Sequence, residues 1–257
     1  MEGEKTLEDK LLRMEHLQED EVRIAGVTIK ESEAKVIASL LKEMKFFNKT
    51  NAPKEHEQYD MLTRDYFQVK DKHITGVFRH PEAPILLYKR LLHNVHKLPE
   101  LRALGLKNCY LQKIPSQVYD IPHLQELYLT GNAITILDSD LNKLQELRKL
   151  CLYNNKLNSI PKSVYGLPHL EYLHIGNNHI TTLPQDVAYM KKLRILAMHE
   201  NQLQINPHVL EELPALEELW IDKKFKVPVT KTNEQLHAAY QKTLQNLVIK
   251  GVAVKRM

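Results

Sequence analysis

This chain contains one cysteine and two histidines that could together bind a metal ion or form a catalytic pair. Cys151 and His174 stand 23 residues apart, and His199 follows further along. A thiolate with imidazole nitrogens can hold zinc, and a cysteine beside a histidine can form a nucleophile–base pair. Either chemistry requires a fold that brings distant segments together. The eight glycines do not cluster as a phosphate-binding loop, and the sequence contains neither a CxxC nor an HExxH pattern.

A repeat of fixed length could bring such residues together. Leucine recurs at intervals of 23 residues, at Leu101, Leu124, Leu147, Leu170, Leu193 and Leu216. Each leucine opens the phrase L-x-x-L-x-L-x-x-N/C-x-L, which reads LRKLCLYNNKL from Leu147. The sixth copy, LEELWIDKK, lacks the asparagine and ends the array. This pattern is typical of leucine-rich repeats.

Each half of the repeat predicts one kind of element. The apolar residues of L-x-x-L-x-L alternate, which predicts a short strand with one buried face, and successive copies predict a parallel sheet. The second half, I-P-x-x-V in several copies, predicts a compact 3₁₀ or short helical return segment on the convex side. The ninth position should bond buried main-chain groups of the turn, and it holds Cys109, Asn132, Asn155, Asn178 and Asn201.

The phase of the repeat also identifies the side chains that should leave the core on the concave face. Those suited to contact a partner are Tyr128, Tyr153, Tyr172, His174, His199 and Trp220. Tyrosine and tryptophan combine apolar area with a polar group, as interface hot spots do. The alternative is the ordinary preference of sheets for aromatic residues. Cys151 and His174 share a column on adjacent strands about 4.8 Å apart, so a metal-binding or hydrolytic patch of Cys151, His174 and His199 is a second hypothesis.

The flanks of the array predict further elements. We expect an acidic helical arm over 1–21, an α+β capping region with an irregular first repeat over 22–100, repeats over 101–221, and a carboxyl-terminal cap over 222–257. The expected elements are an amphipathic helix or a partly ordered arm within 5–18, a hairpin over 22–29, a helix over 31–47, a loop over 48–60, a hairpin over 66–78, a helix over 85–95, a helix over 232–247 and a strand over 251–255. Caps should cover the open ends of the array.

The repeat residues resemble a known family. Leu101 to Leu219 is similar to intracellular leucine-rich-repeat proteins of the 23-residue class, including the Ras-suppressor-like group. The lead-in FQVKDKHITGV resembles archaeal and bacterial members, whereas VFRHPEAP departs from their usual first repeat. The resemblance implies an α/β horseshoe solenoid that binds another protein, in some members a small GTPase. It implies neither catalytic residues nor a cofactor.

Charge and cysteine content indicate which partners and which cellular location to expect. The net charge is +4, with an acidic stretch over 1–22 and a basic stretch from Lys223 to Arg256. Basic ends can attract nucleic acid or anionic lipid, but solvated surface is the simpler interpretation. The opening MEGEKTLEDK does not resemble a signal peptide, no apolar run could span a membrane, and the two cysteines lie in different repeats. We therefore expect a cytoplasmic, non-enzymatic interaction module with unpaired cysteines.

Overall fold

The computed structural model describes residues 15–18, 21–24, 27–36, 67–71, 73–78, 85–202, 208–222 and 234–257. The chain divides into two compact units. The first comprises residues 1–106 with 120–123, and the second comprises residues 107–119 with 124–257. The strand of the first repeat copy thus belongs to the first unit, whereas we expected the capping region to end at residue 100 and the repeats to begin at residue 101.

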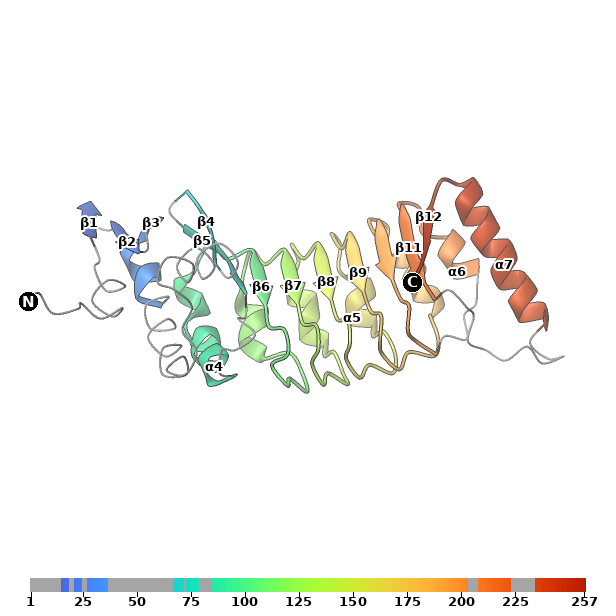
Figure 1. Cartoon of the computed structure of the whole chain (residues 1–257), viewed down its shortest axis with the longest axis horizontal. Coiled ribbons are helices and arrows are strands. Elements are labelled where there is room, and N and C mark those ends of the chain that lie inside the picture. Colours follow the sequence, from blue (N-terminus) through green and yellow to red (C-terminus); the bar gives the residue numbers. More distant parts are fainter. Residues whose placement is uncertain are drawn as a thin grey trace, which may run out of the picture. The chain divides into compact units, whose positions relative to one another are not determined.

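Parallel strands form the framework of the second unit (Figure 1). They are β7 (Glu126–Tyr128), β8 (Lys149–Cys151), β9 (Tyr172–His174), β10 (Ile195–Ala197), β11 (Glu218–Ile221) and β12 (Ala253–Arg256). From β7 to β11, neighbouring strands pair in register one repeat apart, so Leu150 lies beside Leu173 and Leu196 beside Leu219. These leucines are fully buried. The parallel sheet confirms the predicted leucine-rich-repeat solenoid.

Short helical segments return the chain between strands. They are η2 (Ser116–Asp120), η3 (Ser139–Lys143), α5 (Lys162–Tyr165), η4 (Gln185–Tyr189) and α6 (His208–Glu211). Val118, Val164 and Val187, three residues after the prolines, are buried against the core. The predicted compact 3₁₀ or short helical return is confirmed.

Buried asparagines hold the turns that follow the strands. Asn155 Oδ1 accepts the main-chain N–H of Ile134 at 3.1 Å, and its Nδ2 donates to the carbonyls of Leu129 at 2.9 Å and Leu152 at 3.0 Å. Bonds of the same kind are made by Asn132, Asn178 and Asn201. Each side chain therefore joins two adjacent repeats and satisfies main-chain groups that water cannot reach. Cys109 Sγ lies 3.6 Å from the Lys107 carbonyl, a weaker bond within its own repeat.

The residue just before each ninth position adopts the left-handed backbone conformation. These residues have φ between 50° and 71°, and they are Asn108, Gly131, Asn154, Asn177 and Glu200. Glycine and asparagine tolerate this region, whereas most other residues pay a steric penalty. Glu200 is therefore the residue in the series whose type does not suit its backbone.

The end of the second unit contains α7 (Glu234–Ile249) followed by β12. Tyr240, Leu244 and Leu247 of the predicted apolar stripe are buried. Glu211 on α6 accepts hydrogen bonds from Thr243 Oγ1 at 2.8 Å and Asn246 Nδ2 at 3.1 Å, which tie α7 to the array. The predicted helix and strand are confirmed, while their role as a cap stays a prediction.

The first unit is built from antiparallel strands and short helices. An antiparallel sheet contains β1 (Glu15–Gln18), β2 (Glu21–Ile24) and β3 (Val27–Lys30). A hairpin contains β4 (Phe67–Lys70) and β5 (His73–Phe78), and β5 pairs in parallel with β6 (Ala103–Gly105). Residues 31–36 are helical, α4 spans Ile85–His93, and η1 spans Val95–Lys97. Both predicted hairpins and the helix near 85–95 are confirmed.

One prediction for this unit is wrong. Residues 15–18 form strand β1 rather than the end of an amphipathic helix, because they pair with β2. The rest of the expected arm, the expected helix beyond 36 and the expected loop over 48–60 lie outside the described residues.

A buried carboxylate connects two elements of the first unit. Glu33 is 1% exposed; its Oε2 accepts the Ile74 main-chain N–H at 2.6 Å, and its Oε1 lies 2.6 Å from His73 Nδ1. Charge-assisted bonds of this kind are stronger than neutral ones. They fix the segment over 31–36 against β5.

Candidate functional site

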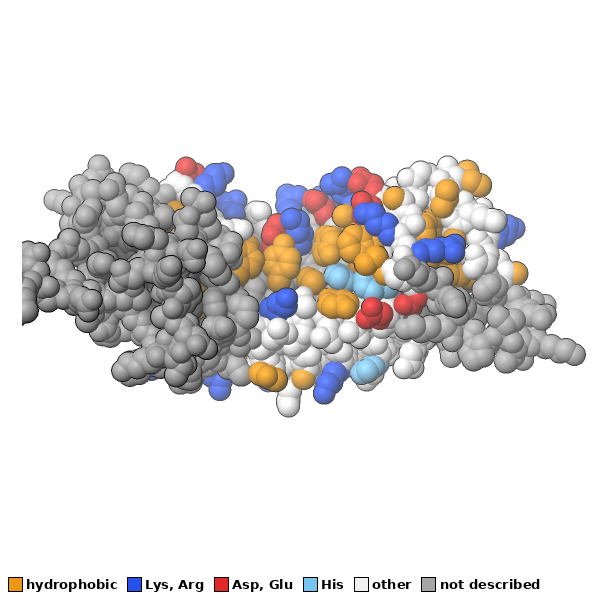
Figure 2. All heavy atoms as spheres, viewed as in Figure 1, with side chains coloured by type: hydrophobic (Ala, Val, Ile, Leu, Met, Phe, Trp, Pro, Cys, Tyr) orange, Lys and Arg blue, Asp and Glu red, His pale blue; other side chains and the backbone are white. Residues whose placement is uncertain are grey.

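The open face of the sheet carries a concentrated group of rings. Figure 2 shows hydrophobic and histidine side chains gathered together on this face, with charged side chains around them. Five ring side chains come from β8 to β11 and the turns that follow them: Tyr153, Tyr172, His174, His199 and Trp220. We call these five residues the aromatic–histidine cluster. All five were predicted to share one face.

His174 lies at the centre of the cluster. The centroid of its ring is 4.9 Å from that of Tyr153, 5.3 Å from His199, 6.1 Å from Trp220 and 6.2 Å from Tyr172. The contacts with Tyr172 and Trp220 are edge-to-face, a favourable geometry for aromatic pairs. The repeat thus brings together residues from four successive copies.

Tyr128, the sixth predicted contact residue, lies on β7 opposite Cys151 in the strand register. Its hydroxyl donates to Glu126 Oε2 at 2.7 Å. Burial, followed by this hydrogen bond, raises the pKa of Tyr128 above its ordinary value, so the phenol stays protonated.

His199 is more deeply placed than its position in the repeat predicts. It is 5% exposed, and Ala197 is fully buried. Gly176 explains the close approach, because a Cβ there would lie 3.1 Å from both His174 Nε2 and His199 Cε1. His199 lies with the other rings of the cluster, but its imidazole is covered by those of Tyr153 and His174 rather than exposed.

Two imidazole nitrogens in this cluster have no hydrogen-bond partner among the residues that the structure describes. They are His174 Nε2 and His199 Nδ1, and both atoms are buried. Burial, followed by the charge of His199, lowers the pKa of His174 to about 4. His174 is therefore neutral at physiological pH. A buried polar atom without a hydrogen bond reduces stability, so we expect a further hydrogen-bonding group to contact these nitrogens.

Cys151 does not extend the cluster into an evident metal site. Its Sγ lies 3.7 Å from His174 Nδ1 and 3.2 Å from Thr130 Oγ1, and the residue is 8% exposed. In the part of the chain that the structure describes, no group of three or more histidine, cysteine, aspartate or glutamate residues could hold a metal ion. The thiol–imidazole contact is real, but the sulfur is covered, so the geometry gives little support to the metal-binding or hydrolytic hypothesis.

Ion pairs between neighbouring strands border one side of the cluster. Lys149 Nζ meets Glu126 Oε1 at 2.7 Å, and Lys255 Nζ meets Glu218 Oε2 at 2.7 Å. Lys255 also lies 5.0 Å from the centre of the Trp220 ring, within cation–π range. Arg194 makes two bonds to Glu217, and Arg148 pairs with Glu171.

Acidic side chains lie on the other side. The Tyr153 hydroxyl is 3.5 Å from Glu200 Oε2, and Asp222 Oδ1 accepts the Glu200 main-chain N–H at 2.8 Å. The repeat pattern places Gly176 and Asp222 at the outward-facing seventh position, but neither they nor Glu200 were predicted as site residues. Gly176 replaces the side chain that other copies carry at the seventh position, and Glu200 replaces the usual asparagine or glycine at the eighth, so both departures were visible in the alignment of repeats.

Comparisons with known proteins agree with the repeat. A family model described as "Leucine-rich repeat region" matches residues 138–250, and one described as "Leucine rich repeat" matches residues 99–157. The chain is a leucine-rich-repeat protein. No curated protein matches it significantly.

Similar solved structures include a leucine-rich-repeat protein of Leptospira interrogans, with 23% identity, a TM-score of 0.48, and coverage of 63% of this chain and 38% of that one. An internalin of Listeria monocytogenes has 20% identity, a TM-score of 0.47, and coverage of 65% and 43%. The chain therefore spans less than half the length of these two proteins. Pollen receptor kinase 3 has 22% identity, a TM-score of 0.50, and coverage of 75% and 98%, which supports the fold alone.

No helix among the described residues has the length and apolar character needed to cross a bilayer.

Proposed function

We propose that this chain is a non-enzymatic interaction module, and that its aromatic–histidine cluster contacts a partner protein on the open face of the sheet. Leucine-rich-repeat proteins typically serve as interaction modules. The observation that carries the proposal is the set of five contacting rings bordered by charged side chains. An aromatic centre inside a polar rim is the usual arrangement of a protein interface.

The polar atoms within the rings favour a protein partner over a purely apolar ligand. Within the described residues, His174 Nε2 and His199 Nδ1 have no hydrogen-bond partner. A hydroxyl or amide of the bound protein could satisfy one of them after a small ring movement. Because His174 is held neutral, its Nε2 can act as a donor or as an acceptor, according to the tautomer. A partner side chain that supplies the missing bond would gain specificity as well as affinity.

The test uses a partner captured from the native cell and then measured by titration calorimetry. Tyr153→Ala should weaken binding by about 2 kcal/mol or more, the usual hot-spot magnitude. Tyr189→Ala is the matched control, because Tyr189 is a 70% exposed tyrosine on the return segment η4. Equal losses for the two variants, or a loss for Tyr189→Ala alone, would refute the proposed site.

Trp220→Ala provides a second probe with a stability control. The ring is half-buried and contacts His174, so its removal should also reduce stability, by about 1–2 kcal/mol. The sequence alone predicts little change in stability, since it places Trp220 outside the core. Binding of Trp220→Ala and of the parent protein is therefore compared at a temperature where circular dichroism shows that both are folded.

The finer proposal is a signalling partner, in particular a small GTPase, and it rests on the resemblance of the repeats to the Ras-suppressor-like group. Titration with a Ras-family GTPase loaded with a non-hydrolysable GTP analogue tests it directly. If the GTPase binds the parent protein and Tyr153→Ala equally well, it binds outside the aromatic–histidine cluster. We also propose a cytoplasmic location, supported by Cys109 and Cys151, which are buried and form no disulfide bond with each other.

A further inference from the structure

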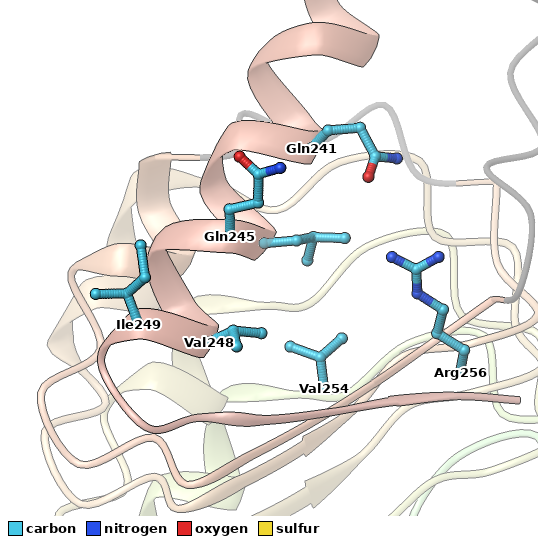
Figure 3. A pocket seen from close by; sticks show the side chains of 7 residues that line it. Gln241, Gln245, Val248, Ile249, Val254 and Arg256 are labelled. Atoms are coloured by element: carbon cyan, nitrogen blue, oxygen red, sulfur yellow. The ribbon is translucent and has the colours of Figure 1, made fainter.

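A cavity of about 490 Å³ lies between α7 and β12 at the end of the second unit. Its lining includes Leu244, Val248, Ile249 and Val254, together with the polar side chains of Gln241, Gln245 and Arg256. Figure 3 shows Val248 of α7 opposite Val254 of β12, with Arg256 extending from β12 towards α7. Val248 is 57% exposed and Ile249 82% exposed, so large apolar side chains are left uncovered here. The volume falls within the range of about 300–1,000 Å³ that is usual for binding pockets.

The same cavity adjoins a strand edge with which no other described strand pairs. In the order of the described strands, β12 is the last and pairs with β11 alone. Ala253 and Met257 donate their main-chain N–H groups to Glu217 and Ile221 of the preceding repeat. Because main-chain groups alternate in direction along a strand, Val254 and Arg256 turn their N–H and C=O groups away from β11. These groups can accept an additional strand.

The register shows what an added strand would meet. Val254 lies beside Leu219, and Arg256 lies beside Ile221, on the core side of the sheet. Arg256 therefore occupies a row in which the repeats carry apolar side chains. In the described part of the chain, its guanidinium has no ion pair or hydrogen bond, whereas Lys255 pairs with Glu218 and Lys250 donates to the Glu211 carbonyl. An adjacent strand that fits would place an apolar side chain next to Val254 and a carboxylate next to Arg256.

We propose that the β12 edge and the α7–β12 cavity bind an extended segment of another protein, in which an apolar residue and an acidic residue stand two positions apart. The segment adds to the sheet as a strand, with its main chain bonded to Val254 and Arg256. Its apolar side chain enters the cavity, and its carboxylate pairs with Arg256. This site is separate from the aromatic–histidine cluster and does not depend on the function proposed there.

Charge argues against a second copy of this chain as the occupant. Two β12 strands paired side by side would bring Lys255 and Arg256 of one copy close to those of the other. Like charges on directly adjacent strand positions are destabilising. An acidic segment instead supplies the complementary charge.

The probe is an acetylated, amidated peptide of about seven residues, a usual strand length, with the sequence Thr-Glu-Thr-Ile-Thr-Glu-Thr. Its symmetric pattern suits either strand direction. Titration into the full chain should show saturable binding, and amide hydrogen exchange at Val254 and Arg256 should slow in the complex. No binding at about 1 mM peptide would overturn the proposal.

Charge reversal tests the pairing with Arg256. Arg256→Glu should weaken binding of the glutamate peptide by at least about tenfold, the scale of one charge-assisted hydrogen bond, and should restore binding to a peptide with lysine in place of glutamate. Lys162→Glu, at an exposed lysine of α5, makes the same charge change elsewhere and should leave both affinities unchanged. Binding to the glutamate peptide that survives Arg256→Glu would contradict the assigned contact.

Val254→Pro tests the strand addition. The proline removes an N–H that points away from β11, so the sheet should remain folded while the peptide loses a main-chain partner. Peptide affinity should fall at least about tenfold, the scale expected when a hydrogen bond is lost and the site is blocked. Unchanged affinity would rule out strand addition. Concentration-dependent dimers of the chain alone that disappear in Val254→Pro would instead identify a second copy as the occupant and overturn the proposal.

Discussion

Replacing Glu200 by asparagine should stabilise the protein while removing a carboxylate from the border of the aromatic–histidine cluster. Glu200 has φ of 57°, in the series of turn positions otherwise occupied by asparagine and glycine. An ordinary residue in this region costs roughly 1–2 kcal/mol, and asparagine costs less because its short side chain bonds locally. The main-chain N–H bond from Glu200 to Asp222 does not depend on the side chain and should persist.

The expected gain follows from what the substitution adds and removes. The contact between Tyr153 and Glu200 is long, at 3.5 Å, and exposed, so its loss costs little. Relief of the backbone penalty should therefore dominate and give about 0.5–1 kcal/mol of stabilisation. For a unit of this size, that corresponds to a rise of about 1–4 °C in Tm.

The reverse substitution in the neighbouring repeat is the matched control. Asn177 has φ of 50° and the same place in its turn, so Asn177→Glu should destabilise the protein by about 1 kcal/mol. Both variants are compared with the parent by urea denaturation, followed by circular dichroism and by fluorescence of Trp220, the only tryptophan in the chain. If Glu200→Asn lowers the unfolding midpoint and Asn177→Glu leaves it unchanged, the strain argument is wrong.

Further predictions concern the turn, the central histidine and the glycine beneath it. Asn155→Ala should destabilise the protein by about 1–3 kcal/mol, because three buried main-chain groups lose their partner, whereas exposed Lys156→Ala should cost under about 0.5 kcal/mol in the same urea assay. The pKa of His174 is lowered from 6.5 to about 4 in the folded state, so the unfolded state binds a proton first as the pH falls. The free energy of unfolding should therefore be highest above about pH 6.5 and should decrease by about 1–2 kcal/mol as the pH falls towards 4, after allowance for solvent screening. Unfolding midpoints in urea measure this loss. His174→Gln should remove that pH dependence, and His179→Gln, at an exposed histidine, should retain it; a parent protein with flat stability between these pH values would contradict the assignment. Gly176→Ala should force the rings of His174 and His199 apart, and a nuclear magnetic resonance spectrum with unchanged imidazole shifts would show that the glycine does not control their contact.

The repeat framework was predictable because one short phrase determines it many times over. Each copy specifies the strand phase, the asparagine position and the proline of the return segment, so strand pairing such as Leu150 with Leu173 follows from counting. The same counting placed Tyr153, His174 and Trp220 on one face. Regular backbone geometry transmits sequence spacing directly into spatial position.

What counting missed depends on side-chain packing and on departures from the repeat. The burial of His199 arises from the absence of a Cβ at Gly176 and from rings that lean over the sheet, and periodicity contains neither effect. Strand β1 was mistaken for helix because the leucine spacing near it suits a helix, while pairing with β2 decides the outcome. The pKa of His174 likewise follows from burial and a neighbouring imidazole, so the titration window lies below the one expected for an exposed histidine.

The ion pairs along the second position of the repeat have a consequence for how this array can change in length. Arg148, Glu171, Arg194 and Glu217 alternate in sign, and the observed pairs join consecutive copies. Deletion of the single copy that begins at Leu170 would set Arg148 beside Arg194, and duplication of any one of these copies would likewise set like charges side by side. Gain or loss of two adjacent copies preserves the alternation. In evolution, and in any attempt to engineer a longer or shorter array, this part of the protein should therefore accept new units in pairs more readily than singly.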